Sequence, residues 1–250
     1  MKIWIIWLRK LILWLLVLAT WEALSRVSPW IPSAWGILRL VVANLTDPQI
    51  LTALGRSLLR MIAGFAGVFV LGIGAGLLLG RFRILDDVFG TVAMALHAMP
   101  GAAWVPLAVL LFGLNQWAVI FTVLLGATGI VMVSTSAGIK EVPPLLLRAA
   151  RTMGAKGTKI FWHVIVPSAV PRIVDGLRLA WAFGWRALMA GELMIGSLKG
   201  MGDVLSRVAK GGDLHQILAF MVIIAAMSLT VDRLIFRKME DLIKTRWGTA

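Results

Sequence analysis

A polar and basic stretch between residues 141 and 171 lies between long apolar runs and has the most distinctive spacing in the chain. Its centre reads Arg148-Ala149-Ala150-Arg151-Thr152-Met153-Gly154, followed by nine residues and then by Val164-Ile165-Val166-Pro167. Two interpretations fit these residue types. One is an ordinary interhelical loop with a solvated basic face. The other, which the spacing favours, is a docking surface for a soluble partner protein.

Local signals predict a helix-turn-helix in this stretch. Pro143-Pro144 suit the first helical turn, where a missing N–H costs nothing. We expect a helix over about 144–153 that ends at Gly154, with Leu145, Leu146, Ala149, Ala150 and Met153 on its apolar face. A second short helix is expected over 158–164, with Pro167 and Pro171 turning the chain toward the next apolar run.

Two other stretches are candidates for a solute pathway. Prolines interrupt the apolar run 88–113, and they free backbone carbonyls at membrane depth. The pathway candidates here are His97, Met99, Pro100 and Trp104. As a lone histidine, His97 is more often a satisfied core group than a ligand or proton relay.

The apolar run 170–195 carries Arg178, Arg186 and Glu192, and charges inside a membrane helix need a partner, a cavity or a function. Arg186 and Glu192 complete the set of pathway candidates. Arg186 falls at or beyond mid-membrane, where a guanidinium attracts an anionic solute. The alternative interpretation, given equal weight, is that Arg186 forms an ion pair with Glu192, or with an acidic residue of another helix or of a neighbouring subunit.

Composition requires a bilayer as solvent. The chain has 250 residues, 60% hydrophobic and 15% charged, with a mean hydropathy of +0.90 and no cysteine. Its net charge of +13 comes from short clusters between apolar runs, which argues against nucleic-acid binding. We expect one all-α membrane domain over residues 1–250.

Six apolar runs reach the roughly 20 residues needed to span a bilayer. The expected spans are about 11–28, 57–80, 88–113, 117–137, 170–195 and 216–236, with the helix-turn-helix in the loop 141–167. The first lacks a following cleavage site and is expected to be a retained anchor. Loops are expected at 29–55, with a short interfacial helix at 33–45, and at 196–215, which is glycine-rich and expected to be flexible. Gly72, Gly76 and Gly80 form a small-residue ridge for helix packing.

Loop charges predict the orientation. If both termini are cytoplasmic, sixteen of the 25 Lys and Arg lie on that side and seven on the other, with Arg56 and Arg60 at the lip of the second span. The chain has no phosphate-loop signature, no metal-spaced His or Cys cluster and no nucleophile elbow. We therefore expect no catalytic residue, no metal and no cofactor bound by this chain.

The spacing around Gly154 resembles the EAA loop of binding-protein-dependent ABC transporter permeases: Glu-Ala-Ala, three residues, Gly, nine residues, and an aliphatic pair before Pro. The family's Glu is Arg148 here. His97-Ala98-Met99-Pro100-Gly101-Ala102-Ala103-Trp104-Val105-Pro106-Leu107 resembles the third span of the nitrate, sulfonate and taurine branch. The resemblance covers about residues 29–247.

This resemblance implies a homodimeric permease in the bacterial cytoplasmic membrane that works by alternating access. Two ATPase subunits, which hold ATP and Mg, would dock on the loop, and a binding protein would deliver the solute. The implied docking residues are Arg148, Ala149, Ala150, Gly154, Phe161 and Pro167. A small anion such as a sulfonate, taurine or nitrate is the expected solute. The alternatives are an uncharged vitamin or pyrimidine precursor, a passive channel and a membrane-embedded enzyme.

Overall fold

The computed structural model describes residues 2–28 and 30–247, and all regular structure in that part of the chain is helical. The elements are α1 (Lys2–Val27), α2 (Ala34–Leu45), α3 (Pro48–Arg81), α4 (Arg83–Ala98), η1 (Gly101–Trp104), α5 (Val105–Phe112), α6 (Gln116–Lys140), α7 (Pro144–Thr152), α8 (Thr158–Ile160), η2 (Phe161–Ile165), α9 (Val166–Ile195), α10 (Met201–Gly211), α11 (Leu214–Val231), η3 (Asp232–Phe236) and α12 (Arg237–Trp247). The all-α prediction is confirmed.

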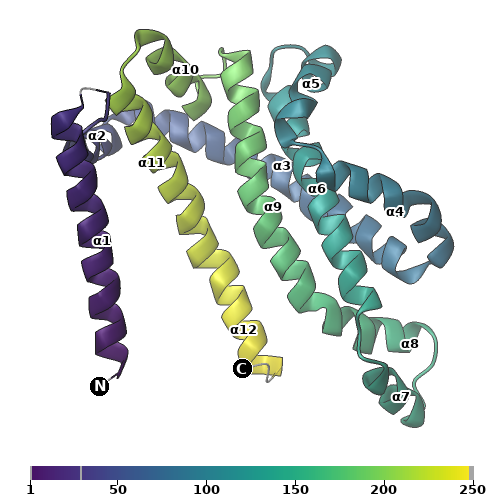
Figure 1. Ribbon diagram of the computed structural model, residues 1–250. Coiled ribbons are helices and arrows are strands. Elements are labelled where there is room, and N and C mark those ends of the chain that lie inside the picture. The colour runs from purple at the N-terminus through teal and green to yellow at the C-terminus, as the bar shows by residue number, and fades with distance from the viewer. Residues whose placement is uncertain (1, 29, 248–250) are drawn as a thin grey trace.

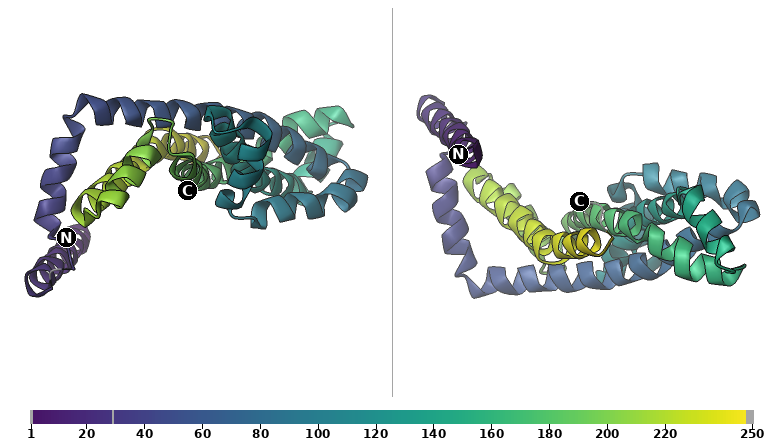
Figure 2. Two further views of the ribbon diagram at one scale, coloured as in Figure 1. Left: turned by 90° about the horizontal axis from the view of Figure 1, so that it is seen from above. Right: turned by 90° about the horizontal axis from the view of Figure 1, so that it is seen from below.

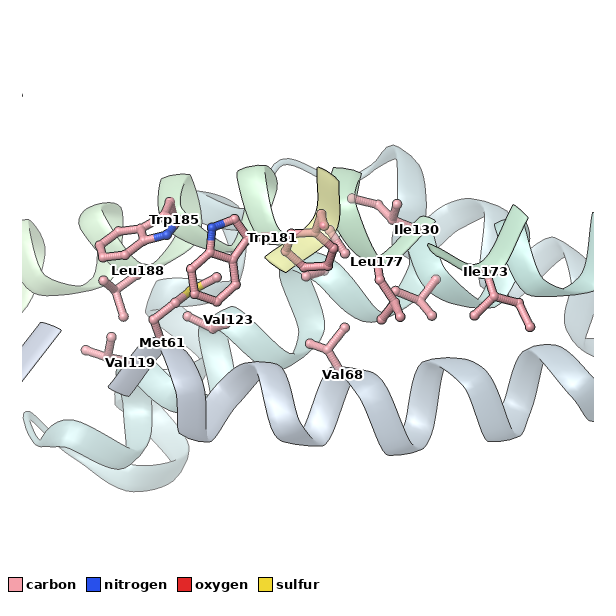
Figure 3. Close-up of a cluster of buried hydrophobic side chains, with 14 of the residues drawn as sticks. Met61, Val68, Val119, Val123, Ile130, Ile173, Leu177, Trp181, Trp185 and Leu188 are labelled. Carbon is pink, nitrogen blue, oxygen red and sulfur yellow. The ribbon is translucent and has the colours of Figure 1, made fainter. Parts of the chain in front are cut away.

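Helix α6 is the centre of the fold, and α3, α4, α5 and α9 pack around it (Figure 1). Its buried positions include small residues such as Gly126, Gly129 and Gly138, so neighbouring backbones approach closely. Such contact matters in a bilayer, because lipid is as apolar as leucine and helices associate through packing. The large side chains of this core come mainly from α3, α6 and α9, with Met61, Val123 and Trp181 among them (Figure 3).

Helices α3 and α6 run in parallel along a ridge of glycines. A side chain at Gly72 would lie 2.7 Å from Val131, one at Gly76 2.5 Å from Thr135, and one at Gly80 2.7 Å from Ile139. The four-residue steps match on both helices, as when one row of side chains fills the groove of another. The predicted packing role of these three glycines is confirmed.

Helix α9 packs antiparallel on another face of α6. A side chain at Gly138 would lie 2.8 Å from Arg172, whereas one at Gly126 would lie 3.1 Å from Ala187, near the opposite end of α9. Trp181 of α9 meets Phe65 of α3 edge to face, with ring centroids 5.2 Å apart. Helix α9 is thereby fixed between α3 and α6.

The chain's first two helices lie away from this bundle (Figure 2). Helix α1 contacts α2, and α2 reaches α11 through a hydrogen bond of 3.0 Å between the side chains of Asn44 and Gln216. Both termini lie at the same end of the molecule as α7 and α8 (Figure 1). The described side chains of α1 are mostly exposed and apolar, which suits contact with lipid.

Four helical stretches are long and apolar enough to cross a membrane: Pro48–Arg81, Gln116–Lys140, Thr158–Ile195 and Leu214–Ile243. The pair formed by Arg83–Ala98 and Gly101–Phe112, bent by 104°, counts as a fifth if it is one span. The described part of the chain therefore supplies four or five of the six predicted spans on these criteria. The first predicted span, 11–28, is helical in α1 as far as Val27 but carries Glu22 and Arg26 in its later part.

Helix α3 begins nine residues before the predicted start at 57. Asp47 caps its N-terminus by accepting a hydrogen bond of 2.8 Å from the Gln49 N–H, and Pro48 occupies the first turn. The expected loop therefore ends at Asp47, and the expected interfacial helix at 33–45 corresponds to α2 at Ala34–Leu45.

Candidate functional site

The α7–η2 hairpin, residues 144–165, projects from one end of the bundle (Figure 1). Helix α7 ends at Thr152, and Gly154 stops it as the sequence predicts, two residues later and with φ +85°. The N–H of Gly154 donates to the Arg151 carbonyl and that of Ala155 to the Ala150 carbonyl, both at 3.0 Å. This is a Schellman cap, which satisfies carbonyls at the helix end and fixes the turn.

The six predicted docking residues differ in their exposure. Ala150 and Phe161 are buried and hold the hairpin against the bundle, where the Phe161 ring lies 4.9 Å from the Arg81 guanidinium. Arg148, Ala149 and Gly154 are on the surface. Pro167 is partly buried in α9.

The predicted apolar face of α7 does not pack inward as a whole. Leu145 and Met153 are 74% and 82% exposed, and Leu146 is also exposed. These three residues are spread along the exposed side of α7, and we call them together the apolar tip, while Ala150 and the partly buried Leu147 face the protein. An apolar surface beside Arg148 and Arg151 at the end of a projecting hairpin is typical of a protein interaction site.

The predicted turn at Pro167 and Pro171 is wrong, because α8, η2 and α9 form one continuous helix from Thr158 to Ile195. The segment η2 is a π-helix in which the Val166 N–H donates to the Phe161 carbonyl. This wider turn lies just before Pro167, which has no N–H to donate and whose ring would crowd a normal helix. The hairpin is therefore joined to the membrane span without a break.

The pathway candidates in the third predicted span lie at a break between helices. Helix α4 ends at Ala98, Met99 and Pro100 are extended, and η1 leads into α5 after a bend of 104°. Gly101 sits against α6 and α9, where a side chain on it would lie 2.7 Å from the Ala187 side chain. Met99 and Pro100 are exposed, whereas Trp104 is partly buried with its indole N–H unpaired.

His97 is exposed at the end of α4, so the expectation of a satisfied core histidine is wrong. Its backbone, rather than its ring, makes the close contact. A side chain added at Gly129 of α6 would lie 2.4 Å from the His97 nitrogen. The glycine in α6 thus allows α4 to reach its break at close range.

Arg186 and Glu192 are not partners. Arg186 is exposed on α9, with its guanidinium 4.7 Å from the Phe183 ring, and it forms no ion pair within residues 2–28 and 30–247. It shares an exposed stripe with Asp175, Leu179 and Ala182. Arg186 directly precedes the buried Ala187, which contacts Gly101 at the break between α4 and α5. The interpretation of Arg186 as the partner of Glu192 is wrong.

Glu192 is fully buried in a carboxylate cluster that the sequence did not reveal. Its Oε1 lies 2.6 Å from an Arg60 nitrogen, and the Ser57 hydroxyl donates to Oε2 at 2.7 Å. The Gly202 N–H donates to the same oxygen at 2.9 Å, and Arg60 also donates to the Leu198 carbonyl at 2.6 Å. We call Ser57, Arg60, Glu192 and residues 200–202 the buried carboxylate cluster.

This cluster corrects two predictions. Arg60 is buried within α3 and is not a loop charge at its lip, which leaves six rather than seven cations on the side opposite the termini. The expected flexible loop at 196–215 contains α10, in whose first turn the Gly202 N–H donates to Glu192 and the Met201 N–H to Ser57. An arginine and a serine three residues apart, in the otherwise apolar run 57–80, were the available signal.

A second ion-pair group joins α9 to the chain's last helices. Arg178 lies 2.6 Å from Asp232 and 3.1 Å from Glu240. Arg178, the third charged residue singled out in the predicted fifth span, therefore has a structural role. Among the described residues, no group of three or more His, Asp or Glu side chains is placed to hold a metal ion.

Comparison with known proteins agrees with this arrangement. Residues 69–240 match the family model described as "Binding-protein-dependent transport system inner membrane component". The chain is 34% identical over 177 residues to a protein of Methanocaldococcus jannaschii that carries the name of an ABC transporter permease, covering 71% of this chain and 66% of that one. A bicarbonate transport system permease protein of Synechococcus elongatus is 29% identical, over 72% of this chain and 64% of its own.

A nitrate import permease protein of Synechocystis is 26% identical over 76% of this chain and 69% of its own. The matches thus span about two thirds of the length of these relatives. Among solved structures, an inward-facing form of the MetNI methionine ABC transporter has a similar fold. Its TM-score is 0.65 at 16% identity, and the match covers 78% of this chain and 96% of that one. The chain therefore belongs to the binding-protein-dependent inner membrane components, a family of ABC transporter permeases.

Proposed function

We propose that this chain is the permease subunit of an ATP-driven importer for a small anionic solute. Two copies would form the pathway, a pair of cytoplasmic ATPase subunits would dock on the two α7–η2 hairpins, and a binding protein would deliver the solute from outside. The apolar tip carries most of this proposal, because a projecting hairpin with exposed Leu145 and Met153 suits a protein partner. ATP and Mg would be bound by the partner.

The continuous helix from Thr158 to Ile195 suggests how docking is converted into movement. Its first turn belongs to the hairpin, and its far half carries Arg186 and contacts the α4–α5 break through Ala187. Closure of the ATPase pair would push on the hairpin, and a helix without a break would carry that displacement to the pathway. ATP must then favour one permease conformation through these contacts, which is what alternating access requires.

Two observations support an anionic solute. Relatives at 29% and 26% identity are named for bicarbonate and nitrate transport. Arg186 is exposed, directly precedes the residue that contacts Gly101 at the helix break, and has no carboxylate partner in the described part of the chain. A planar guanidinium binds nitrate, bicarbonate and sulfonate oxygens well.

Docking is tested by co-purification. We would tag the chain, solubilise membranes of its native host in mild detergent, and look for a protein of about 25–30 kDa that hydrolyses ATP. Gly154→Pro should lose this protein, because proline is incompatible with φ +85° and removes the N–H that bonds to Arg151. Met153→Asp should lose it as well, since the change places a charge in the apolar tip.

Thr158→Asp is the matched control, because it adds the same charge at an exposed polar position in the hairpin's second arm. It should retain the ATPase. If the wild type brings down no ATPase, or if all three variants retain it, the hairpin is not a docking element. Conductance through the reconstituted chain would then be measured to test for a passive channel.

A further inference from the structure

A hollow of about 450 Å³ lies between the end of α3 and the α7–η2 hairpin. Three cations line it, namely Arg81 from α3 with Arg151 and Lys156 from the hairpin. Leu147, Ile160 and Ile165 give it an apolar floor. We call it the cationic hollow.

Among the described residues, none is a carboxylate partner of these three cations. No acidic residue lines the hollow, and none of the three forms an ion pair in the described part of the chain. The nearby acids are already paired, Asp86 with Lys140 at 2.6 Å and Glu141 with Arg172 at 2.9 Å. Like charges around one hollow repel one another unless an anion lies between them.

The position of Arg81 is set by the Phe161 ring, 4.9 Å away, so this cation is held at the wall of the hollow. Arg81 is also the last residue of α3, a helix long and apolar enough to cross the bilayer. Phe82 and Ile84 follow it and are exposed. The hollow therefore lies at the level of the lipid headgroups, where cationic side chains meet phosphate.

We propose that the cationic hollow binds the phosphate group of an anionic phospholipid such as phosphatidylglycerol. The three cations would contact the phosphate, and the lipid's glycerol and first acyl carbons would cover the apolar floor. An acidic side chain of a partner protein fits less well, because the hollow lies between the hairpin and the end of α3 and has an apolar floor that a lone carboxylate would leave uncovered. A bound lipid would link α3 to the hairpin.

The inference does not require the proposed transport function, because lipid binding by the purified full-length chain is measured directly. The chain would be exchanged into a neutral detergent and titrated with phosphatidylglycerol or phosphatidylcholine. Native mass spectrometry would count bound lipid, and thermal unfolding would report stabilisation. Inorganic phosphate in large excess would serve as the free-anion arm.

The variant Arg151→Gln/Lys156→Gln removes two cations from the hollow and should weaken phosphatidylglycerol binding roughly thirtyfold. The control Arg148→Gln/Lys159→Gln makes the same two changes on the same hairpin outside the hollow, and should bind as the wild type does. All four residues are exposed, so neither variant should affect folding. Equal unfolding midpoints in phosphatidylcholine would verify this.

Three results would overturn the proposal. One is equal loss of lipid in the two variants, which would mean diffuse attraction to charge. Another is stabilisation by inorganic phosphate as large as that by lipid, which would make the hollow a free-anion site. The third is unchanged lipid binding with loss of the ATPase from the Arg151→Gln/Lys156→Gln variant, which would assign the hollow to the partner protein.

Discussion

The carboxylate of Glu192 lies 2.6 Å from the guanidinium of Arg60, and the two side chains are 0% and 9% exposed. Glu192 is on α9, whereas Arg60 is on α3, and the carboxylate also accepts hydrogen bonds from Ser57 and from the start of α10. One buried charge pair thus joins three helices. Its two charges are satisfied only while all three stay in place, because an unpaired buried charge is costly.

Glu192→Ala should destabilise the protein by about 3–5 kcal/mol, since it leaves the Arg60 guanidinium buried without its partner. For a chain of this size the midpoint of thermal unfolding should fall by roughly 10 °C. Tryptophan fluorescence in detergent would measure it, because Trp181 and Trp185 are buried in the core.

Glu141→Ala is the matched control for this change. It removes an exposed carboxylate that lies 2.9 Å from Arg172, and such a pair contributes about 1 kcal/mol or less. Replacing both Arg60 and Glu192 by Met should recover much of the stability, because no charge is then left unpaired. A similar loss in Glu192→Ala and Glu141→Ala would contradict the role given to the buried pair.

Gly200→Ala should loosen the start of α10. The added carbon would lie 2.4 Å from both carboxylate oxygens of Glu192, so the carboxylate or the helix must move. Backbone strain is not the cause, because φ at Gly200 is −99°. We expect faster hydrogen exchange at the amides of Met201 and Gly202, which now donate to Ser57 and Glu192. Gly211→Ala, where nothing lies within 4 Å, should leave that exchange unchanged.

Gly76→Ala should destabilise the contact between α3 and α6. Its new carbon would lie 2.5 Å from the Thr135 side chain and 2.8 Å from the Met132 carbonyl, an overpacking that costs about 1–3 kcal/mol. Gly74→Ala makes the same change two residues away, where nothing lies within 4 Å. Thermal unfolding should separate the two variants, with only Gly76→Ala lowered. Equal midpoints would show that the ridge does not hold the helices together.

Features that depend on neighbouring residues could be predicted from the sequence. Pro144 and Gly154 mark the two ends of α7, and the four-residue spacing of Gly72, Gly76 and Gly80 predicts a packing ridge. Both signals are local, because helix ends depend on proline and on positive φ, and a ridge depends on periodicity. The helical class and the hairpin follow from the same kind of signal.

Features that depend on distant contacts could not be predicted. Arg60 and Glu192 are 132 positions apart, and the residues around either one do not indicate that the other is its partner. The glycines near α10 suggested a flexible loop, whereas Gly200 and Gly202 are small because the Glu192 side chain occupies the space next to them. Pro167 and Pro171 suggested a turn, but the π-helical η2 accommodates them within one helix.

Arg186→Gln should raise the solute concentration needed for half-maximal uptake by at least about tenfold, because a charge-assisted hydrogen bond is worth about 1.5–3 kcal/mol. Uptake would be measured in vesicles that hold the permease with its native ATPase and binding protein, with nitrate, bicarbonate and a sulfonate as solutes. Arg39→Gln is the matched control, since Arg39 is also exposed and lies 5.3 Å from the ring of its helical neighbour Trp35. Stability should be unchanged in both, as neither arginine forms an ion pair in the described part of the chain.

If Arg186 instead meets an acid of a second copy, Arg186→Gln will weaken the dimer and leave the half-maximal concentration as it was. That result, or unchanged affinity and rate for all three anions, would remove Arg186 from the pathway.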